Sequence, residues 1–161
     1  EHCSQHFIFR TSWVFGAYGA NFLKTMLRVM QERDALRVVA DQHGAPTSAA
    51  LIADVTAQVV AAYLKGHVSS AQFGTYHLAS SGSTTWHGYA QLVGQTAAAL
   101  GVTLKVQPDA IAPIATEDYP LPAPRPANSR MDTSKLRQAF GLALPDWEDD
   151  VRRVLRQLIS R

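Results

Sequence analysis

The stretch Phe7-Ile8-Phe9-Arg10-Thr11-Ser12-Trp13-Val14-Phe15-Gly16 decides the fold of this chain. Its first three residues form an apolar, β-favouring run that is too short for a helix. The run ends in polar residues and a tryptophan, and a glycine-marked loop follows at 16–19. Open α/β sheets present ligand contacts at the carboxyl ends of their strands in this way. A buried strand whose Trp13 only fills the core explains the local pattern equally well.

Apolar residues recur at helical spacing in five places further along the chain. Helices are therefore expected over residues 22–30, from Thr47 or Ser48 to Lys65, and over 86–100, 133–140 and 146–159. Short strands are expected over residues 36–40, 73–79 and 104–106. The segment 108–126 is rich in proline, which predicts an extended surface segment rather than a helix or a central strand.

The composition is that of an ordinary globular domain, with 47% hydrophobic and 17% charged residues. A formal charge of +2 with interspersed signs gives no basic stripe, so no nucleic-acid partner is expected. Neither a membrane-spanning run nor a signal peptide is recognisable, so no membrane partner is expected. The single cysteine, Cys3, cannot form an internal disulfide, which favours a reducing, cytoplasmic location. A chain that begins at Glu1 rather than Met suits a fragment of a longer protein.

Several polar side chains stand where strands end or helices begin. Asn21 precedes the first helix, where its amide can cap the helix or face an anion. Asp41 and Gln42 follow the strand at 36–40, and they can bind the base or ribose of a nucleotide or only satisfy loop amides. Arg125 lies in the proline-rich segment, and its planar guanidinium suits a diphosphate.

Four stretches resemble the dTDP-4-dehydrorhamnose reductase family of extended short-chain dehydrogenases/reductases, in the same order. They are RTSWVFG at 10–16, VVADQHGAPT at 38–47, YHL at 76–78 and RPANSRMD at 125–132. Together they span nearly the whole chain. The glycine-rich dinucleotide fingerprint and the Tyr-x-x-x-Lys pair of the family have no counterpart, so the chain resembles the C-terminal half of the enzyme.

The resemblance implies an α/β fold, the C-terminal part of an extended short-chain dehydrogenase/reductase, with small sheets and about five helices. Most of the Rossmann sheet would be lacking. Residues 1–16 would be the last part of the Rossmann-like domain, comprising a strand and the substrate loop, and residues 17–161 would be the substrate-binding domain.

The resemblance also implies an activity, the NADPH-dependent (or NADH-dependent) reduction of dTDP-4-dehydro-L-rhamnose to dTDP-L-rhamnose in polysaccharide biosynthesis. The family transfers a hydride to the C4 ketone while a tyrosine, assisted by a lysine, supplies the proton. Because these groups lie outside the chain, no catalytic residue is expected in it, and it is expected to be inactive alone. The implied partner is a dTDP-sugar, and a homodimer is compatible with the family.

Roles for individual residues follow from the resemblance. Trp13 would pack against the sugar ring near the nicotinamide, and Thr11 and Ser12 would line the loop near the cofactor. Asn21 and Arg125 would neutralise the diphosphate. Asp41 and Gln42 would face the nucleoside.

Two departures from the family pattern bear on these roles. The family commonly has two adjacent basic residues where this chain has Pro124 and Arg125, so a single arginine must serve, with Arg130 as the alternative. Some members bind Mg²⁺ through separate glutamates at a dimer contact. Glu148 matches one such position, but Ala50 stands where another carboxylate is expected, so the Mg²⁺ site is incomplete and no metal site is predicted.

A different class of function is also open. The same superfamily includes non-catalytic regulatory or binding subunits, such as the partner of methionine adenosyltransferase. The Trp13 segment favours the enzyme.

Overall fold

The computed structural model describes residues 3–120, 122–123 and 125–160, and it contains the five helices expected from the sequence. They are α1 (Phe22–Glu32), α2 (Ala49–Leu64), α3 (Trp86–Ala99), α4 (Ser134–Phe140) and α5 (Trp147–Ile159). The expected α/β architecture with small sheets is confirmed. Short 3₁₀ turns, η1 (Ser70–Gln72), η2 (Pro108–Ala110) and η3 (Thr116–Asp118), complete the helical elements.

The strands of the described residues form pairs rather than one continuous sheet. Three pairs are parallel: β1 (Phe7–Arg10) with β6 (Gly74–His77), β2 (Val14–Phe15) with β5 (Thr47–Ser48), and β3 (Arg37–Val39) with β8 (Ala112–Ile114). One pair, β4 (His43–Gly44) with β7 (Thr84–Thr85), is antiparallel. Each parallel pair joins segments far apart in the sequence, as parallel pairing requires.

Two expectations about the segment 104–126 were wrong. Residues 104–106 form no strand, because the amides of Lys105 and Val106 both donate to the carbonyl of Met30 at 2.8 and 3.1 Å instead of entering a ladder. The proline-rich segment is not extended throughout, since η2, β8 and η3 lie within it. Pro113 is accommodated in β8 because a strand with one neighbour tolerates a missing amide hydrogen.

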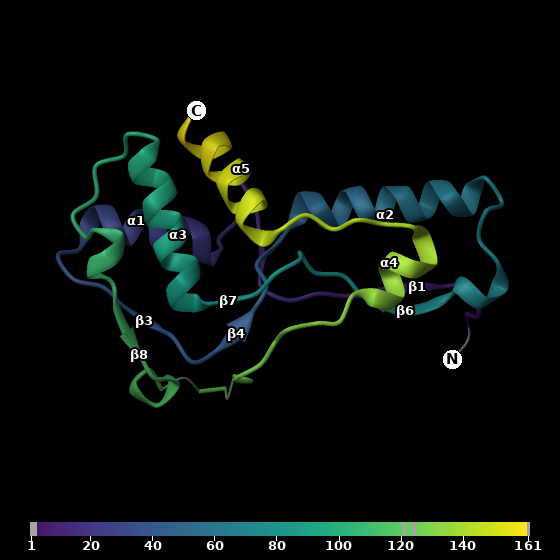
Figure 1. Cartoon of the computed structure of the whole chain (residues 1–161), viewed down its shortest axis with the longest axis horizontal. Coiled ribbons are helices and arrows are strands. Elements are labelled where there is room, and N and C mark those ends of the chain that lie inside the picture. The colour runs from purple at the N-terminus through teal and green to yellow at the C-terminus, as the bar shows by residue number, and fades with distance from the viewer. Residues whose placement is uncertain (1–2, 121, 124, 161) are drawn as a thin grey trace.

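The molecule is elongated, and its elements gather around two hydrophobic clusters (Figure 1). The larger cluster lies among α1, α3, α5 and β3, and Leu23, Met30, Val93 and Val151 are fully buried in it. The smaller cluster lies among α2, α4, β1 and β6, around Val59, Tyr76 and Leu136. The segment 7–15 thus packs with elements from much later in the chain. The domain boundary between residues 16 and 17 stays a prediction.

A buried polar contact joins α5 to the start of α2. Asp150 is 4% exposed and accepts hydrogen bonds from Ser48 Oγ at 2.5 Å and from Arg153 Nη2 at 2.7 Å. Ser48 in turn caps α2, because its Oγ accepts from the amide of Leu51 at 3.0 Å. In the acidic first turn of α5, Asp150 therefore links α5 to α2, and the negative charge of the turn also complements the helix dipole.

The described residues hold neither a metal-binding cluster nor a membrane-spanning helix. Nowhere in 3–120, 122–123 and 125–160 do three His, Cys, Asp or Glu side chains come together as a metal site would require. No helix in this part of the chain combines the length and the apolar character needed to cross a bilayer.

Candidate functional site

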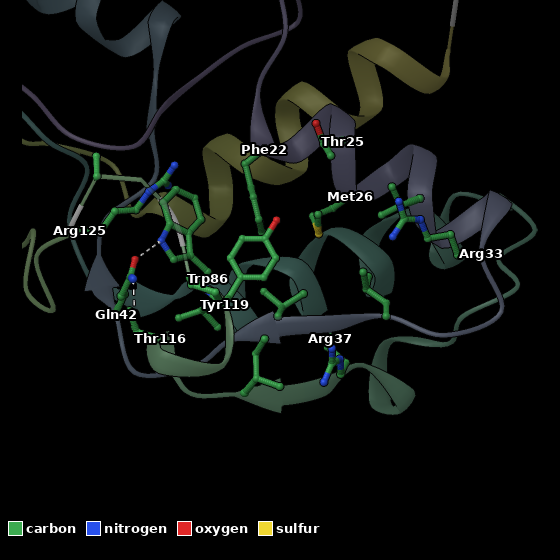
Figure 2. Close-up of a pocket in the computed structure, with 17 residues that line it drawn as sticks. Phe22, Thr25, Met26, Arg33, Arg37, Gln42, Trp86, Thr116, Tyr119 and Arg125 are labelled. Carbon is green, nitrogen blue, oxygen red and sulfur yellow. Dashed lines mark hydrogen bonds between the residues drawn. The ribbon is translucent and has the colours of Figure 1, made fainter.

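A cavity of about 610 Å³ opens between α1 and the paired strands β3 and β8. Its floor is largely apolar, with Met26, Val29, Val38 and Ile114 among the lining side chains. Trp86, the first residue of α3, completes the wall beside Phe22 at the start of α1. The segment after η3 closes one side, where Tyr119 reaches over the floor (Figure 2). The cavity is large enough for a nucleotide-sized ligand.

Three arginines give the cavity its charge. Arg125 lies at the end near Trp86, while Arg33 and Arg37 lie at the other end (Figure 2). Within the described residues, none of the three guanidinium groups makes a hydrogen bond or ion pair. Each therefore remains available to an anionic ligand, and Arg125 is the one beside the polar end of the cavity.

Gln42, in the loop after β3, lines the cavity wall with a polar side chain, and its contact with a nucleoside stays a prediction. The residue is 6% exposed. Its Oε1 accepts from Trp86 Nε1 at 3.1 Å, and its Nε2 donates to Thr116 Oγ1 at 3.0 Å. These bonds join α3, the loop after β3 and η3 around one amide.

Asp41 is not among the residues that line the cavity, but it accepts hydrogen bonds from Thr116, which does line it. Its two carboxylate oxygens accept from the hydroxyl of Thr116 at 2.6 Å and from the amide of Thr116 at 3.0 Å. The bond from the Thr116 hydroxyl is the largest of the causes that hold the pKa of Asp41 below its usual value, and the bond from the Thr116 amide is the next largest. Asp41 thus satisfies a loop amide, the second of the two roles that the sequence left open, and its contact with a nucleoside stays a prediction.

Trp13 reaches the cavity only through Trp86. The two indoles stack with ring centroids 3.7 Å apart and an interplanar angle of 15°. Trp13 has a φ of 50°, the only positive value at a non-glycine position in the described residues. A backbone held in this region costs about 1–3 kcal/mol, and such strain gathers at functional sites. The ring also covers Gly44, where a Cβ would lie 2.5 Å from it.

Asn21 caps α1, the first of its two expected alternatives. Its Oδ1 accepts from the amide of Lys24 at 3.1 Å, and its Nδ2 donates to the carbonyl of Gly16 at 2.8 Å. Its contact with a diphosphate stays a prediction, and among the described residues it is not part of the cavity wall.

Three hydroxyl groups lie buried without a partner at the carboxyl ends of β1 and β6. They belong to Thr11 and Ser12, which follow β1, and to Ser80, which follows β6. No hydrogen-bond partner for them exists within the described residues. Because buried hydroxyls are normally paired, these three need a hydrogen-bond partner that the described residues do not supply.

Several cavity residues were missed by the sequence analysis. Trp86 was expected only to pack, and it does pack on Phe22 with centroids 4.6 Å apart, but it also lines the cavity. Thr116 and Tyr119 lie in the proline-rich segment, where no local pattern marked them. Arg130, the alternative to Arg125, lies outside the cavity wall and bonds Asn128 instead.

Comparison with known proteins gives a consistent picture. A family model described as the RmlD substrate binding domain matches residues 1–160. The dTDP-4-dehydrorhamnose reductase of Shigella flexneri is 48% identical, and that of Escherichia coli K12 is 47% identical; each alignment covers 99% of this chain and 52% of the relative. The chain therefore spans about half the length of the curated relatives it matches. The resemblance drawn from the four sequence stretches is confirmed.

Solved structures agree in fold. The dTDP-4-dehydrorhamnose reductase of Bacillus anthracis, in complex with NADP, is 35% identical with a TM-score of 0.71 over 95% of this chain and 48% of that one. The Clostridium acetobutylicum protein is 29% identical with a TM-score of 0.76, over 94% of this chain and 48% of that one. A dTDP-glucose 4,6-dehydratase from Bacillus anthracis, 12% identical with a TM-score of 0.65 over 96% of this chain and 44% of that one, shares the fold alone.

Proposed function

The chain belongs to the RmlD substrate-binding domain family, and on that premise we propose that it is the C-terminal substrate-binding portion of an NADPH-dependent dTDP-4-dehydro-L-rhamnose reductase that forms dTDP-L-rhamnose. The observation that carries the proposal is the cavity beside α1, which combines an apolar floor, a buried amide and unpaired guanidinium groups. A nucleoside diphosphate needs these three features. The faces of its base are flat and largely apolar, the edge of the base is polar, and the phosphates are anionic.

Each part of such a ligand has a partner in the cavity or next to it. Gln42 contacts the polar edge of the base, while the floor between α1 and β3 covers its faces. Arg125 binds the diphosphate. Asn21, at the start of α1, faces the same diphosphate. The sugar then lies towards Trp13, whose indole is held in place by Trp86 and Gly44.

The unpaired hydroxyls fit a cofactor and sugar on the far side of Trp13. Thr11 and Ser12 can donate hydrogen bonds to polar groups of NADPH or of the sugar, and Ser80 lies at the same ends of the paired strands. NADPH, when bound, supplies the hydride. The chain itself orients the sugar and excludes water with Trp13, while the Tyr-Lys pair of the family belongs to the part of the relatives that this chain does not cover.

The test uses a completed protein, in which this chain replaces its counterpart in the Shigella flexneri relative. NADPH oxidation is followed with dTDP-4-dehydro-L-rhamnose as substrate. The completed protein is expected to turn over, and Trp13→Ala is expected to lower kcat/KM by at least tenfold. A folded completed protein that binds dTDP without oxidising NADPH would favour the non-catalytic subunit over the reductase, and unchanged kinetics in Trp13→Ala would remove the role given to Trp13.

A further inference from the structure

We infer that Asp41 and Thr116 are positioning residues that fix the orientation of the Gln42 amide, and that this orientation selects the base of the bound nucleotide. The inference rests on the proposed function, because it concerns the nucleoside end of the same cavity. It starts from the direction of each hydrogen bond in a row of four side chains, from Trp86 through Gln42 and Thr116 to Asp41.

Both ends of this row have only one option. The indole N–H of Trp86 can only donate, so the atom that faces it at 3.1 Å must be the oxygen of Gln42. The carboxylate of Asp41 can only accept, so the hydroxyl of Thr116 must donate to it across 2.6 Å. The Thr116 oxygen is then left with lone pairs alone, and it accepts from Gln42 Nε2 at 3.0 Å.

The two ends therefore impose the same orientation on the amide. A rotated amide would place its NH₂ group against the indole N–H and its oxygen against a hydroxyl whose hydrogen is already used. Because Gln42 is 6% exposed, water could not replace the two lost bonds easily. Asp41 also accepts a hydrogen bond from the backbone amide of Thr116 at 3.0 Å, so its carboxylate fixes both the backbone and the side chain of that residue.

The fixed amide presents a defined pattern to the cavity. Its oxygen keeps one lone pair and its nitrogen keeps one N–H after the bonds to Trp86 and Thr116 are made. Thymine and uracil offer a donor at N3 beside a carbonyl acceptor, whereas cytosine offers an acceptor at N3 beside an amino donor. An amide that cannot rotate matches one of these edges only. An amide released from Thr116 can rotate and match either.

The experiment compares dTDP and dCDP by calorimetric titration of the completed protein. A matched bidentate contact discriminates by about 1–3 kcal/mol, so dTDP is expected to bind about tenfold to a hundredfold more tightly than dCDP. Thr116→Val removes the hydroxyl with almost no change in shape, and the ratio is expected to fall to about threefold, mainly through tighter binding of dCDP. Thr116→Ser keeps the hydroxyl and is expected to keep the preference.

The outcomes separate this inference from the proposed function. If dTDP binds but Thr116→Val keeps the full preference, the positioning role is wrong and the proposed function stands. A Thr116→Ser variant that loses the preference as fully as Thr116→Val would also overturn the positioning role, because it would show that packing rather than the hydroxyl matters. If the unmodified completed protein does not bind dTDP, the proposed function fails together with the inference.

Discussion

In the proposed function, Arg125 binds the anionic diphosphate of the ligand. Its guanidinium lines the cavity without a hydrogen bond or ion pair among the described residues. Hydrogen bonds to charged groups contribute about 1.5–3 kcal/mol, so Arg125→Gln is expected to weaken dTDP binding about tenfold to a hundredfold. Thymidine, which lacks phosphates, should bind equally well to both proteins. Calorimetric titration of the completed protein with the two ligands measures this difference.

Arg130→Gln is the matched control for this prediction, because Arg130 bonds Asn128 and lies outside the cavity wall. It should leave dTDP binding within about twofold, in keeping with the small effects of surface substitutions. A larger loss in Arg130→Gln than in Arg125→Gln would exchange the roles of the two arginines.

The buried hydroxyl of Tyr89 is expected to contribute nothing to the free energy of unfolding, or to lower it. The residue is 1% exposed, and its hydroxyl has no partner in the described part of the chain. An unsatisfied buried hydroxyl costs about 1–3 kcal/mol, so Tyr89→Phe is expected to keep or raise the free energy of unfolding. Tyr76→Phe is the control, because the Tyr76 hydroxyl donates to the carbonyl of Gln72 at 2.5 Å and its loss should destabilise the fold. Urea denaturation that shows a loss above 1 kcal/mol for Tyr89→Phe would reveal a partner for this hydroxyl.

The same tyrosine predicts a dependence on pH. Burial raises the pKa of Tyr89 far above its ordinary value of 10.0. A group whose pKa is raised in the folded state contributes its full stability below the unfolded pKa, and that contribution is lost as the pH rises through the folded pKa. Above pH 10 the stability of the unmodified chain should therefore fall more steeply than that of Tyr89→Phe. Parallel curves of unfolding free energy against pH would contradict this.

At the scale of elements, the short strand β4 matters because its glycine makes room for Trp13. A Cβ at Gly44 would lie 2.5 to 2.8 Å from three ring atoms of Trp13, so Gly44→Ala is expected to displace the indole from Trp86. Loss of the near-ultraviolet circular dichroism of the stacked pair would report the displacement. Gly16→Ala is the control, because its Cβ would meet only Ala49 at an ordinary 3.5 Å. An unchanged spectrum in Gly44→Ala would show that the two indoles are not held together by this close contact.

The contact between α5 and α2 gives a second prediction at this scale. Asp150→Ala leaves Ser48 and Arg153 without their shared acceptor, and removal of one partner from a buried charged pair costs about 3–5 kcal/mol. A loss at the lower end is expected, because the Arg153 side chain is 53% exposed. Asp149→Ala is the control, since the Asp149 side chain is 74% exposed and should change the unfolding free energy by less than about 0.5 kcal/mol. Similar urea midpoints for the two variants would contradict a buried link between the helices.

The elements show what could be predicted from the sequence and what could not. Helices were predictable because apolar spacing and caps such as Asn21 and Asp146 act within a few residues. The false strand at 104–106 arose because an apolar run does not say where its amides will bond, and here they bond the end of α1. Gln42 and Arg125 were expected as site residues from loop chemistry and family resemblance, and both line the cavity, while their contacts with a ligand stay predictions. Thr116 could not be expected, because its importance comes from a bond to Asp41, 75 residues away in the sequence.

At the scale of the whole molecule, the site lies where separate segments meet. The cavity belongs to the larger hydrophobic cluster, while the unpaired hydroxyls follow β1 and β6 of the smaller one (Figure 1). Trp13 lies between them, directly after Thr11 and Ser12 in the chain and stacked on the cavity residue Trp86. In the proposed function the nucleotide occupies one side of this indole, and the reacting sugar occupies the other.

The most direct test of the nucleotide site is the indole N–H signal of Trp86 in a nitrogen–proton correlation spectrum of the completed protein, recorded during titration with dTDP. A Trp86→Phe variant assigns the signal, and Trp147, buried in the core with 6% exposure, serves as the internal reference. The Trp86 signal is expected to shift in proportion to the bound dTDP, because its N–H bonds the Gln42 amide, which contacts the base in the proposed function. The Trp147 signal is expected to stay in place. If calorimetry shows that dTDP has saturated the protein while the Trp86 signal has not moved, the nucleotide binds elsewhere and the proposed site is wrong.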